Sequence, residues 1–303
     1  MSAMAEVCFN SINRRNFIKA GLGACAGLIA LGTSGSFGSS ANDEEMCRWA
    51  LLADTHIPED ISDNYRGFYP YQNLQKAIPQ ILSDLPDGAV IAGDLARLEG
   101  KVGDYEILKE MLTPLAEKRP VYMALGNHDD RDNFLKVFDR IAGVRQSVGG
   151  RHVVVVSKPP VRLIILDSLF YVNKVPGLLG KAQRQWLENY LVNCDDTPTI
   201  LCFHHTLGDG DGELLDVPRL FEIIEPVRKV KAVLYGHSHE YGYSEFEGIH
   251  LINLPAMGYN FSDDQPVGWV QACLTAKGGD FKLHVMAGNK DKDECVTNLS
   301  WRL

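Results

Sequence analysis

Five short groups of His, Asp and Asn residues recur along the chain, and their side chains are of the types that bind divalent metal ions. The groups are Asp54-Thr55-His56, Gly93-Asp94, Gly126-Asn127-His128-Asp129, His204-His205 and Gly236-His237-Ser238-His239. Carboxylate oxygens, an amide oxygen and imidazole nitrogens suit hard and borderline ions. No cysteine belongs to any group, which argues against a structural zinc site. Two such ions held close together can activate water for hydrolysis.

Each group directly follows an apolar run that reads as a buried strand. The runs cover residues 49–53, 89–92, 121–125, 200–203 and 232–235. Apolar runs of this length, rich in β-branched residues, predict strands with both faces covered. The carboxyl ends of such strands are where ligands collect in layered α/β folds. The sequence therefore predicts that all five groups converge on one site. Asp54 and His56, two residues apart on an extended strand end, point the same way and can chelate one ion.

The rest of the chain alternates helix and strand patterns. Helices are predicted near residues 72–83, 104–117, 132–141 and 181–192, and further strands at 152–156, 161–166, 249–254, 269–274 and 281–285. Two long loops, 57–71 and 207–217, interrupt this order. The pattern indicates one α/β domain with two mixed sheets flanked by helices.

The first 41 residues read as a targeting segment. Arg14 and Arg15 precede Phe-Ile-Lys, and a short apolar stretch, 20–31, and a Gly/Ser-rich stretch follow. This order resembles a twin-arginine signal peptide, and the stretch is shorter than the roughly 20 residues of a membrane span. We expect export by the twin-arginine machinery, cleavage near residue 41 and an extracytoplasmic, periplasmic location. Cleavage before Cys25, with a lipid anchor there, is the minor alternative.

Residues 42–303 form the expected catalytic domain, which carries 27 basic and 38 acidic residues, a net charge of −11. Nucleic-acid binding rests on clustered Lys and Arg, so this balance argues against such a partner. Five cysteines remain in this part of the chain, an odd number at irregular spacing. They predict neither a disulfide framework nor a cysteine-rich metal site. The oligomeric state is not indicated.

Taken together, the five groups resemble the calcineurin-like metallophosphoesterase superfamily, whose pattern is D-x-H, G-D, G-N-H-[DE], H and G-H-x-H in this order. The resemblance covers essentially all of residues 42–303. Residues 162–168, together with 180–183, 186–187 and 191, are similar to the branch that contains class III cyclic-nucleotide phosphodiesterases. The resemblance implies a four-layer α-β-β-α sandwich and a centre of two metal ions, Mn, Fe or Zn.

The same resemblance assigns the metal ligands. One ion would be held by Asp54, His56, Asp94 and His239, and the other by Asp94, Asn127, His204 and His237. Asp94 would bridge the two. The family pattern gives the neighbouring His128 a catalytic role, as a proton donor to the leaving oxygen or as a hydrogen-bond donor to the phosphate.

The chain departs from the family pattern three residues after Asp94. Protein phosphatases of the superfamily have an Asp there that orients the equivalent of His128, and purple acid phosphatases have a metal-binding Tyr. This chain has Arg97, which excludes tyrosinate-iron chemistry and leaves Asp129 as the candidate orienting partner. Arg97 either binds substrate phosphate or pairs with Glu99 or Asp104. His205 is the other candidate for substrate binding.

The function predicted from these residues is hydrolysis of a small phosphoester by a water that two metal ions activate. A phosphodiester is the favoured substrate. A phosphomonoesterase has the same metal core and is the alternative. An extracytoplasmic binding protein that lost turnover is the rival class, but such a relative would be expected to lose a ligand, and all seven are present.

Overall fold

The computed structural model describes residues 45–139 and 142–303, and the predicted signal peptide lies outside them. The first of two sheets has the strand order β13-β12-β11-β1-β2-β3. β1 pairs in parallel with β2, and β2 with β3, whereas β11, β12 and β13 add antiparallel pairs. The strands are β1 (Met46–Leu52), β2 (Gly88–Ala92), β3 (Val121–Ala124), β11 (Pro266–Thr275), β12 (Gly278–Gly288) and β13 (Val296–Ser300).

The second sheet has the order β4-β5-β6-β7-β8-β10-β9. Its four central strands, β6, β7, β8 and β10, run parallel, and β4, β5 and β9 complete it in antiparallel pairs. The strands are β4 (Val144–Val148), β5 (Arg151–Lys158), β6 (Val161–Ile165), β7 (Thr199–Cys202), β8 (Val230–Tyr235), β9 (Gly242–Phe246) and β10 (Ile249–Asn253).

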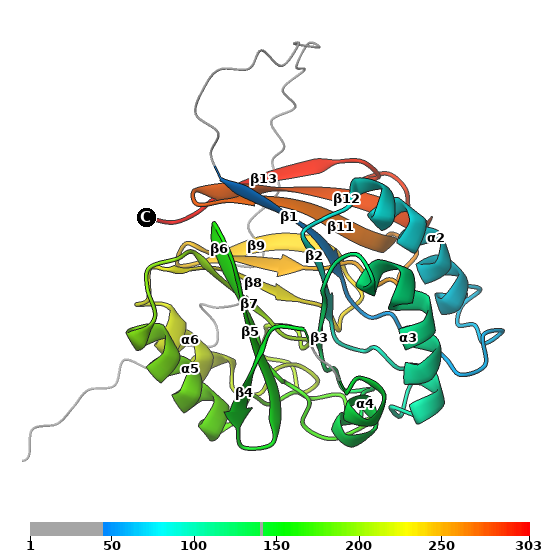
Figure 1. Cartoon of the computed structure of the whole chain (residues 1–303), viewed down its shortest axis with the longest axis horizontal. Helices are drawn as coiled ribbons and strands as arrows, with labels where there is room; N and C mark the ends of the chain where they lie inside the picture. The colour runs from blue at the N-terminus through cyan, green and yellow to red at the C-terminus, as the bar shows by residue number, and fades with distance from the viewer. Residues whose placement is uncertain (1–44, 140–141) are drawn as a thin grey trace, which may run out of the picture.

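Helices cover the outer face of each sheet, so the molecule has four layers (Figure 1). The helices are α2 (Pro70–Asp84), α3 (Val102–Ala116), α4 (Arg131–Val137), α5 (Lys181–Asn193) and α6 (Val217–Ile224). The first three pack against the first sheet, and α5 and α6 against the second. The predicted α-β-β-α sandwich of two mixed sheets is confirmed.

Strand β1 shows how the sequence builds this sandwich. Trp49 and Leu51 point into the core between the two sheets, whereas Ala50 and Leu52 point into the core beneath α2 and α3. Alternate residues of a strand face opposite sides, so a strand with helices on one face and a second sheet on the other is apolar at every position. This explains why the strands that lead to the site appear in the sequence as continuous apolar runs.

Several element boundaries differ from the predictions. The helix predicted to reach residue 141 ends at Val137, and residues 140–141 lie outside the described part. The sequence patterns do not predict α6, which has only eight residues, or the edge strands β4, β9 and β13. These edge strands have mixed burial, so they lack the continuous apolar pattern of the central strands. None of the helices in residues 45–139 and 142–303 combines the length and apolar character that a membrane span requires.

Candidate metal centre

The five predicted groups follow β1, β2, β3, β7 and β8, and the structure brings them together at one end of the two sheets. Five of their side chains sit on residues with a positive φ, a conformation that costs a non-glycine residue about 1–3 kcal/mol. These residues are Asp54 (52°), His56 (45°), Asp94 (47°), His237 (74°) and His239 (56°). The surrounding fold therefore holds the backbone of the site in an unfavourable geometry that aims these side chains inward.

Two glycines allow the strand ends to approach closely. A Cβ atom on Gly126 would collide with a carboxylate oxygen of Asp94, and one on Gly236 would collide with a carboxylate oxygen of Asp54. A side chain at either position would displace a predicted metal ligand. This is the physical reason why glycine precedes the Asn-His and His-Ser-His segments.

The first of two clusters contains Asp54, His56 and His239, whose donor atoms lie within 4.8 Å of one another. The Nε2 atoms of His56 and His239 are 3.1 Å apart, and Asp54 Oδ1 is 3.4 Å from His239 Nε2. All three residues are buried.

The second cluster contains Asp94, His204 and His237, again with donor atoms within 4.8 Å of one another. His204 Nε2 lies 3.2 Å from His237 Nδ1, 3.2 Å from Asn127 Oδ1 and 3.3 Å from Asp94 Oδ1. Asp94 reaches both clusters, because its other oxygen is 3.6 Å from His56 Nε2. Its carboxylate is therefore placed so that it could contribute to both clusters.

Backbone carbonyls fix the tautomers of the four clustered histidines. His56 Nδ1 donates to the carbonyl of Arg97 (3.2 Å), and His239 Nδ1 donates to that of Tyr259 (2.6 Å). His204 Nδ1 donates to Ala92 (2.9 Å), and His237 Nε2 donates to Gly212 (2.9 Å). Since a carbonyl oxygen only accepts, each of these ring nitrogens carries the hydrogen.

The inward nitrogen of each neutral imidazole is therefore a lone-pair donor. With all four rings neutral, the lone pairs of His56 and His239 face each other, and those of His204 and His237 face each other beside an amide oxygen and a carboxylate. Such a convergence of acceptors is repulsive unless positive charge lies among them. The donor set of each cluster fits a divalent metal ion.

The electrostatics of the clusters point the same way. Burial lowers the pKa of His56 to about 3, although Asp94 opposes the shift, and burial together with His204 lowers that of His237 to about 4. Burial also opposes protonation of His204, but Asp94 and Asp54 outweigh it and raise its pKa to about 9. A metal ion at His204 competes with this proton, because the negative charges of Asp94 and Asp54 attract both.

The predicted catalytic residue His128 lies beside the clusters. Its Nδ1 donates to the carbonyl of Leu98 (2.8 Å), and its Nε2 lies 4.0 Å from the shared carboxylate of Asp94. The ring is partly exposed and lines the same cavity as the clustered donors.

The expectation that Asp129 orients His128 is wrong, since the carbonyl of Leu98 does so. Asp129 is fully buried and accepts from the backbone N–H groups of Leu95, Ala96 and Gly126 and from the hydroxyl of Tyr105. Its carboxylate holds the strand ends that carry the ligands. Burial and the nearby Asp94 raise its pKa to about 6.

The expected ion pair of Arg97 with Glu99 or Asp104 is also wrong. Arg97 Nε donates to Asp63 at 2.8 Å, and its guanidinium carbon lies 5.5 Å from the centre of the Tyr259 ring. Tyr259 in turn stacks on His56, with ring centres 4.6 Å apart. Arg97 thus supports the ring of His56 through Tyr259. It is not among the residues that line the cavity.

His205, the second predicted substrate-binding residue, is buried behind the cavity wall. Its Nδ1 is 2.8 Å from the hydroxyl of Ser168, and its ring packs 4.7 Å from that of His237. Ser168 also accepts from the backbone N–H of His204. From this position His205 can support the neighbouring ligand residues, but it does not face the cavity in which a substrate would bind.

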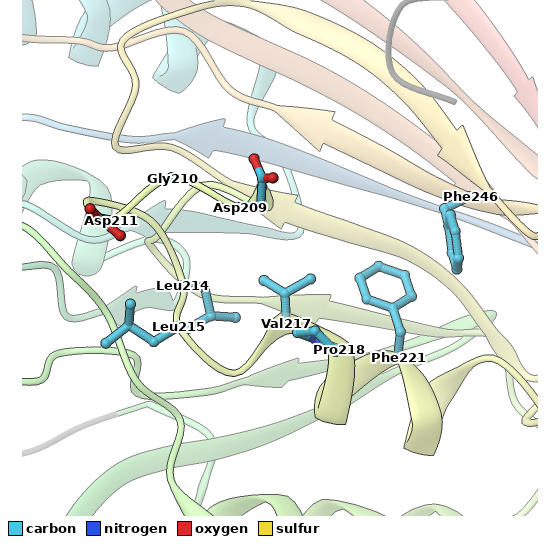
Figure 2. A pocket seen from close by; sticks show the side chains of 10 residues that line it. Asp209, Gly210, Asp211, Leu214, Leu215, Val217, Pro218, Phe221 and Phe246 are labelled. Carbon is cyan, nitrogen blue, oxygen red and sulfur yellow. The ribbon is translucent and has the colours of Figure 1, made fainter. Parts of the chain in front are cut away.

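An open cavity leads to the two clusters. Besides ligand residues and His128, its walls contain Val175, Thr206, Gly212, Glu213, Ser238, Tyr259 and Phe261. The loop between β7 and α6 also lines a second, mainly apolar cavity, which Figure 2 shows between Asp209 and Asp211 on the loop and Phe221 and Phe246. No predicted metal ligand lines that second cavity.

Sequence reasoning missed the backbone carbonyls that orient the histidines, and Ser168, which holds His204 and His205. Carbonyl groups carry no sequence signal. Ser168 does have one, because it ends the segment 162–168 on which the similarity to the phosphodiesterase branch rests.

The chain belongs to the calcineurin-like phosphoesterase family, whose model matches residues 48–241. It is 25% identical over 224 residues to a probable cyclic nucleotide phosphodiesterase of Vesicomyosocius okutanii, a match that covers 72% of this chain and 89% of that protein. It is 24% identical over 219 residues to the glycerophosphodiester phosphodiesterase GpdQ of Enterobacter lignolyticus, with 68% and 76% covered.

The fold also resembles the crystal structure of a dimetal phosphatase from Danio rerio, with a TM-score of 0.67 and 15% identity over 84% of this chain and 99% of that one. With the family membership and the two donor clusters, the chain is a metal-dependent phosphoester hydrolase. This confirms the function and enzyme class that the sequence predicted.

We predict that the shared position of Asp94 makes it the most sensitive ligand. Asp94→Asn removes a charge from both clusters, so both metals should bind more weakly, whereas His56→Ala should affect chiefly one. Elemental analysis of purified protein checks this: about two ions per wild-type chain, about one in His56→Ala and the fewest in Asp94→Asn. The exposed Asp264→Asn is the matched control. Two tightly bound ions in Asp94→Asn would contradict the shared role.

Proposed function

We propose that the protein is a phosphodiesterase that prefers small phosphodiesters to phosphomonoesters. The names of the two curated relatives support a diester, since one is a probable cyclic nucleotide phosphodiesterase and the other a glycerophosphodiester phosphodiesterase. The convergence of imidazole lone pairs and carboxylates on two clusters carries the metal-dependent part of the proposal.

The charge of the cavity supports the diester preference. Two divalent ions against the carboxylates of Asp54 and Asp94 leave a local charge near +2, and Glu213 in the wall lowers it further. Among the described residues that line this cavity there is neither Lys nor Arg. A phosphodiester brings one negative charge, whereas a monoester brings up to two near neutral pH. With Glu213 counted, the local charge is about +1, which the single charge of a diester balances. The second charge of a monoester exceeds it, and no side-chain cation among the described lining residues offsets the excess.

The roles of the chain's own residues follow from their positions. Asp54, His56 and His239 would hold one ion, Asn127, His204 and His237 the other, and Asp94 would contact both. When bound, the ions supply Lewis acidity that activates water and withdraws charge from the phosphoryl oxygens. His128 presents Nε2 to the cavity with its other nitrogen fixed on Leu98, a placement that suits protonation of the leaving oxygen.

The donor set suits Mn, Fe or Zn. Imidazole nitrogens form about half of the ligands proposed for each ion, and carboxylate or amide oxygens form the rest. Borderline transition metals bind such a mixture well, whereas Mg and Ca prefer oxygen ligands alone.

Export is the second part of the proposal. The paired arginines, the short apolar stretch and the Gly/Ser-rich segment support a twin-arginine signal that is removed near residue 41. The twin-arginine route carries folded proteins, which suits a centre whose ligands span residues 54–239 and assemble only in the folded chain.

The diester preference is tested with two substrates that share one leaving group. We predict that kcat/KM for bis(4-nitrophenyl) phosphate exceeds that for 4-nitrophenyl phosphate by about tenfold or more near neutral pH. Chelation should abolish both activities, and Mn, Zn or Fe should restore them. A higher kcat/KM for the monoester would show that the cavity accepts the second charge.

We predict that His128→Ala lowers kcat about 10²- to 10⁴-fold for diesters with poor leaving groups, because these need protonation as the bond breaks. The loss should shrink for 4-nitrophenolate, which leaves without help. Steady-state kinetics across a series of leaving groups measures the difference, with metal content as the control for an intact centre. An equal loss across the series would mean that His128 binds phosphate instead.

We predict that replacing Arg14 and Arg15 together by Lys retains the precursor in the cytoplasm, folded, metal-loaded and active. Cell fractionation followed by an activity assay measures this, and Lys19→Arg is the control because it conserves charge outside the pair. Mass spectrometry of the wild-type product should give an amino terminus near residue 42. Normal export of the double variant, or a lipid on Cys25, would contradict this account.

A further inference from the structure

Phe261 is a large apolar side chain that remains half exposed at the metal centre. It lies in the loop between β10 and β11, lines the cavity that leads to the clusters and is 51% exposed. One face of its ring stacks on the ligand His239, with ring centres 4.3 Å apart and planes 24° from parallel. With that face covered, the exposed area belongs to the opposite face and the ring edges.

Two interactions hold the backbone next to this ring. The guanidinium of Arg66 donates to the carbonyl oxygen of Phe261 and, at 2.6 Å, to the carboxylate of Asp263. Arg66 belongs to the loop between β1 and α2, so it ties that loop to the loop that carries Phe261. The ring is thus held in place without being buried.

Neighbouring aromatic rings complete one wall. Tyr65 meets Phe261 edge to face, with ring centres 6.4 Å apart, and lies 4.8 Å from Tyr259. Tyr259 covers His56 as Phe261 covers His239, but Tyr259 is buried. Phe261 therefore differs from Tyr259 in presenting a free aromatic face beside the first cluster.

A ring that only shielded His239 from water would do so best if it were itself buried. An exposed apolar face next to a reactive centre instead suits a ligand that covers it. Aromatic faces bind other planar rings by stacking, with little dependence on the identity of the second ring. The two cationic side chains beside this wall are each paired with a carboxylate, Arg66 with Asp263 and Arg97 with Asp63. Their charges are therefore largely offset, and the exposed ring face rather than charge selects the group that binds there.

We propose that Phe261 forms a stacking subsite for an aryl or heteroaromatic substituent of the phosphodiester. The inference rests on the proposed function and names the substituent that the site selects. A phosphoryl group at the metal centre places its organic substituents at the cavity wall, and the free face of Phe261 binds the planar one. Tyr65 limits the subsite at its edge, and Arg66 preserves its shape.

The test compares phenylphosphonate with methylphosphonate as competitive inhibitors of diester hydrolysis. The assay is run at about pH 9, above the second pKa of either acid, so that both inhibitors are dianions. Their P–C bond is not hydrolysed, and their inhibition constants then differ only through the organic group. The wild type should bind phenylphosphonate about tenfold more tightly than methylphosphonate. Phe261→Ala should abolish this difference while leaving the inhibition constant of methylphosphonate within about twofold of the wild-type value.

Two further variants separate stacking from shielding. Phe261→Leu keeps an apolar cover on His239 but lacks a ring, so it should lose the preference for phenylphosphonate and keep its metal content. Arg66→Gln should weaken the preference in part, because it releases the loop. An unchanged preference in Phe261→Ala would overturn the inference. Equal weakening of both inhibitors, together with metal loss, would show that Phe261 only shields His239.

Failure of the subsite can be told apart from failure of the proposed function. A wild type that hydrolyses no diester overturns the function, and binding of each phosphonate is then measured directly by calorimetry. An active diesterase whose preference does not depend on Phe261 overturns only the subsite.

Discussion

Mutual repulsion among electron-pair donors is the constraint on which this structure depends. Two pairs of imidazole nitrogens lie 3.1 and 3.2 Å apart, and each ring donates the hydrogen of its other nitrogen to a backbone carbonyl. In the second pair the raised pKa of His204 shows the same constraint, because a proton there offsets the repulsion until a metal ion replaces it. The fold has to hold these groups against their repulsion and supply positive charge between them. Metal binding relieves the repulsion, and so the affinity of the site is built from unfavourable contacts of the protein alone.

The strands and loops divide this task between them. Buried strands, apolar on both faces, fix the positions of the ligand-bearing backbone, and the left-handed conformations at their ends turn the side chains inward. The buried carboxylate of Asp129 then joins three backbone N–H groups, which ties the ends of β2 and β3 together. Strain at Asp54 or His237 is tolerated because the packing of both sheets on either side leaves these residues no alternative position.

Much of this could be predicted from the sequence, for reasons that particular residues make clear. Asp94 and Asn127 follow unbroken apolar runs. Such runs predict buried parallel strands, and this alone places both residues at strand ends. The roles of Asp129 and Arg97 could not be predicted in this way. Both depend on where loops fold back, since Asp129 caps backbone groups more than 30 residues away and Arg97 reaches Asp63. Helix α6 was missed because eight residues after a Gly-rich loop give too short a pattern.

The loop between β1 and α2 contributes Tyr65 and Arg66 to the surroundings of Phe261, and residues 64–69 contain neither a metal donor nor Asp63, the partner of Arg97. Sequence change in this segment can therefore remodel these surroundings while every ligand and its carbonyl partner stays in place. If the proposed subsite selects the substrate, the chemistry and the choice of substrate are separable, because they depend on different segments of the chain. For protein engineering, the same separation makes residues 64–69 the segment to diversify.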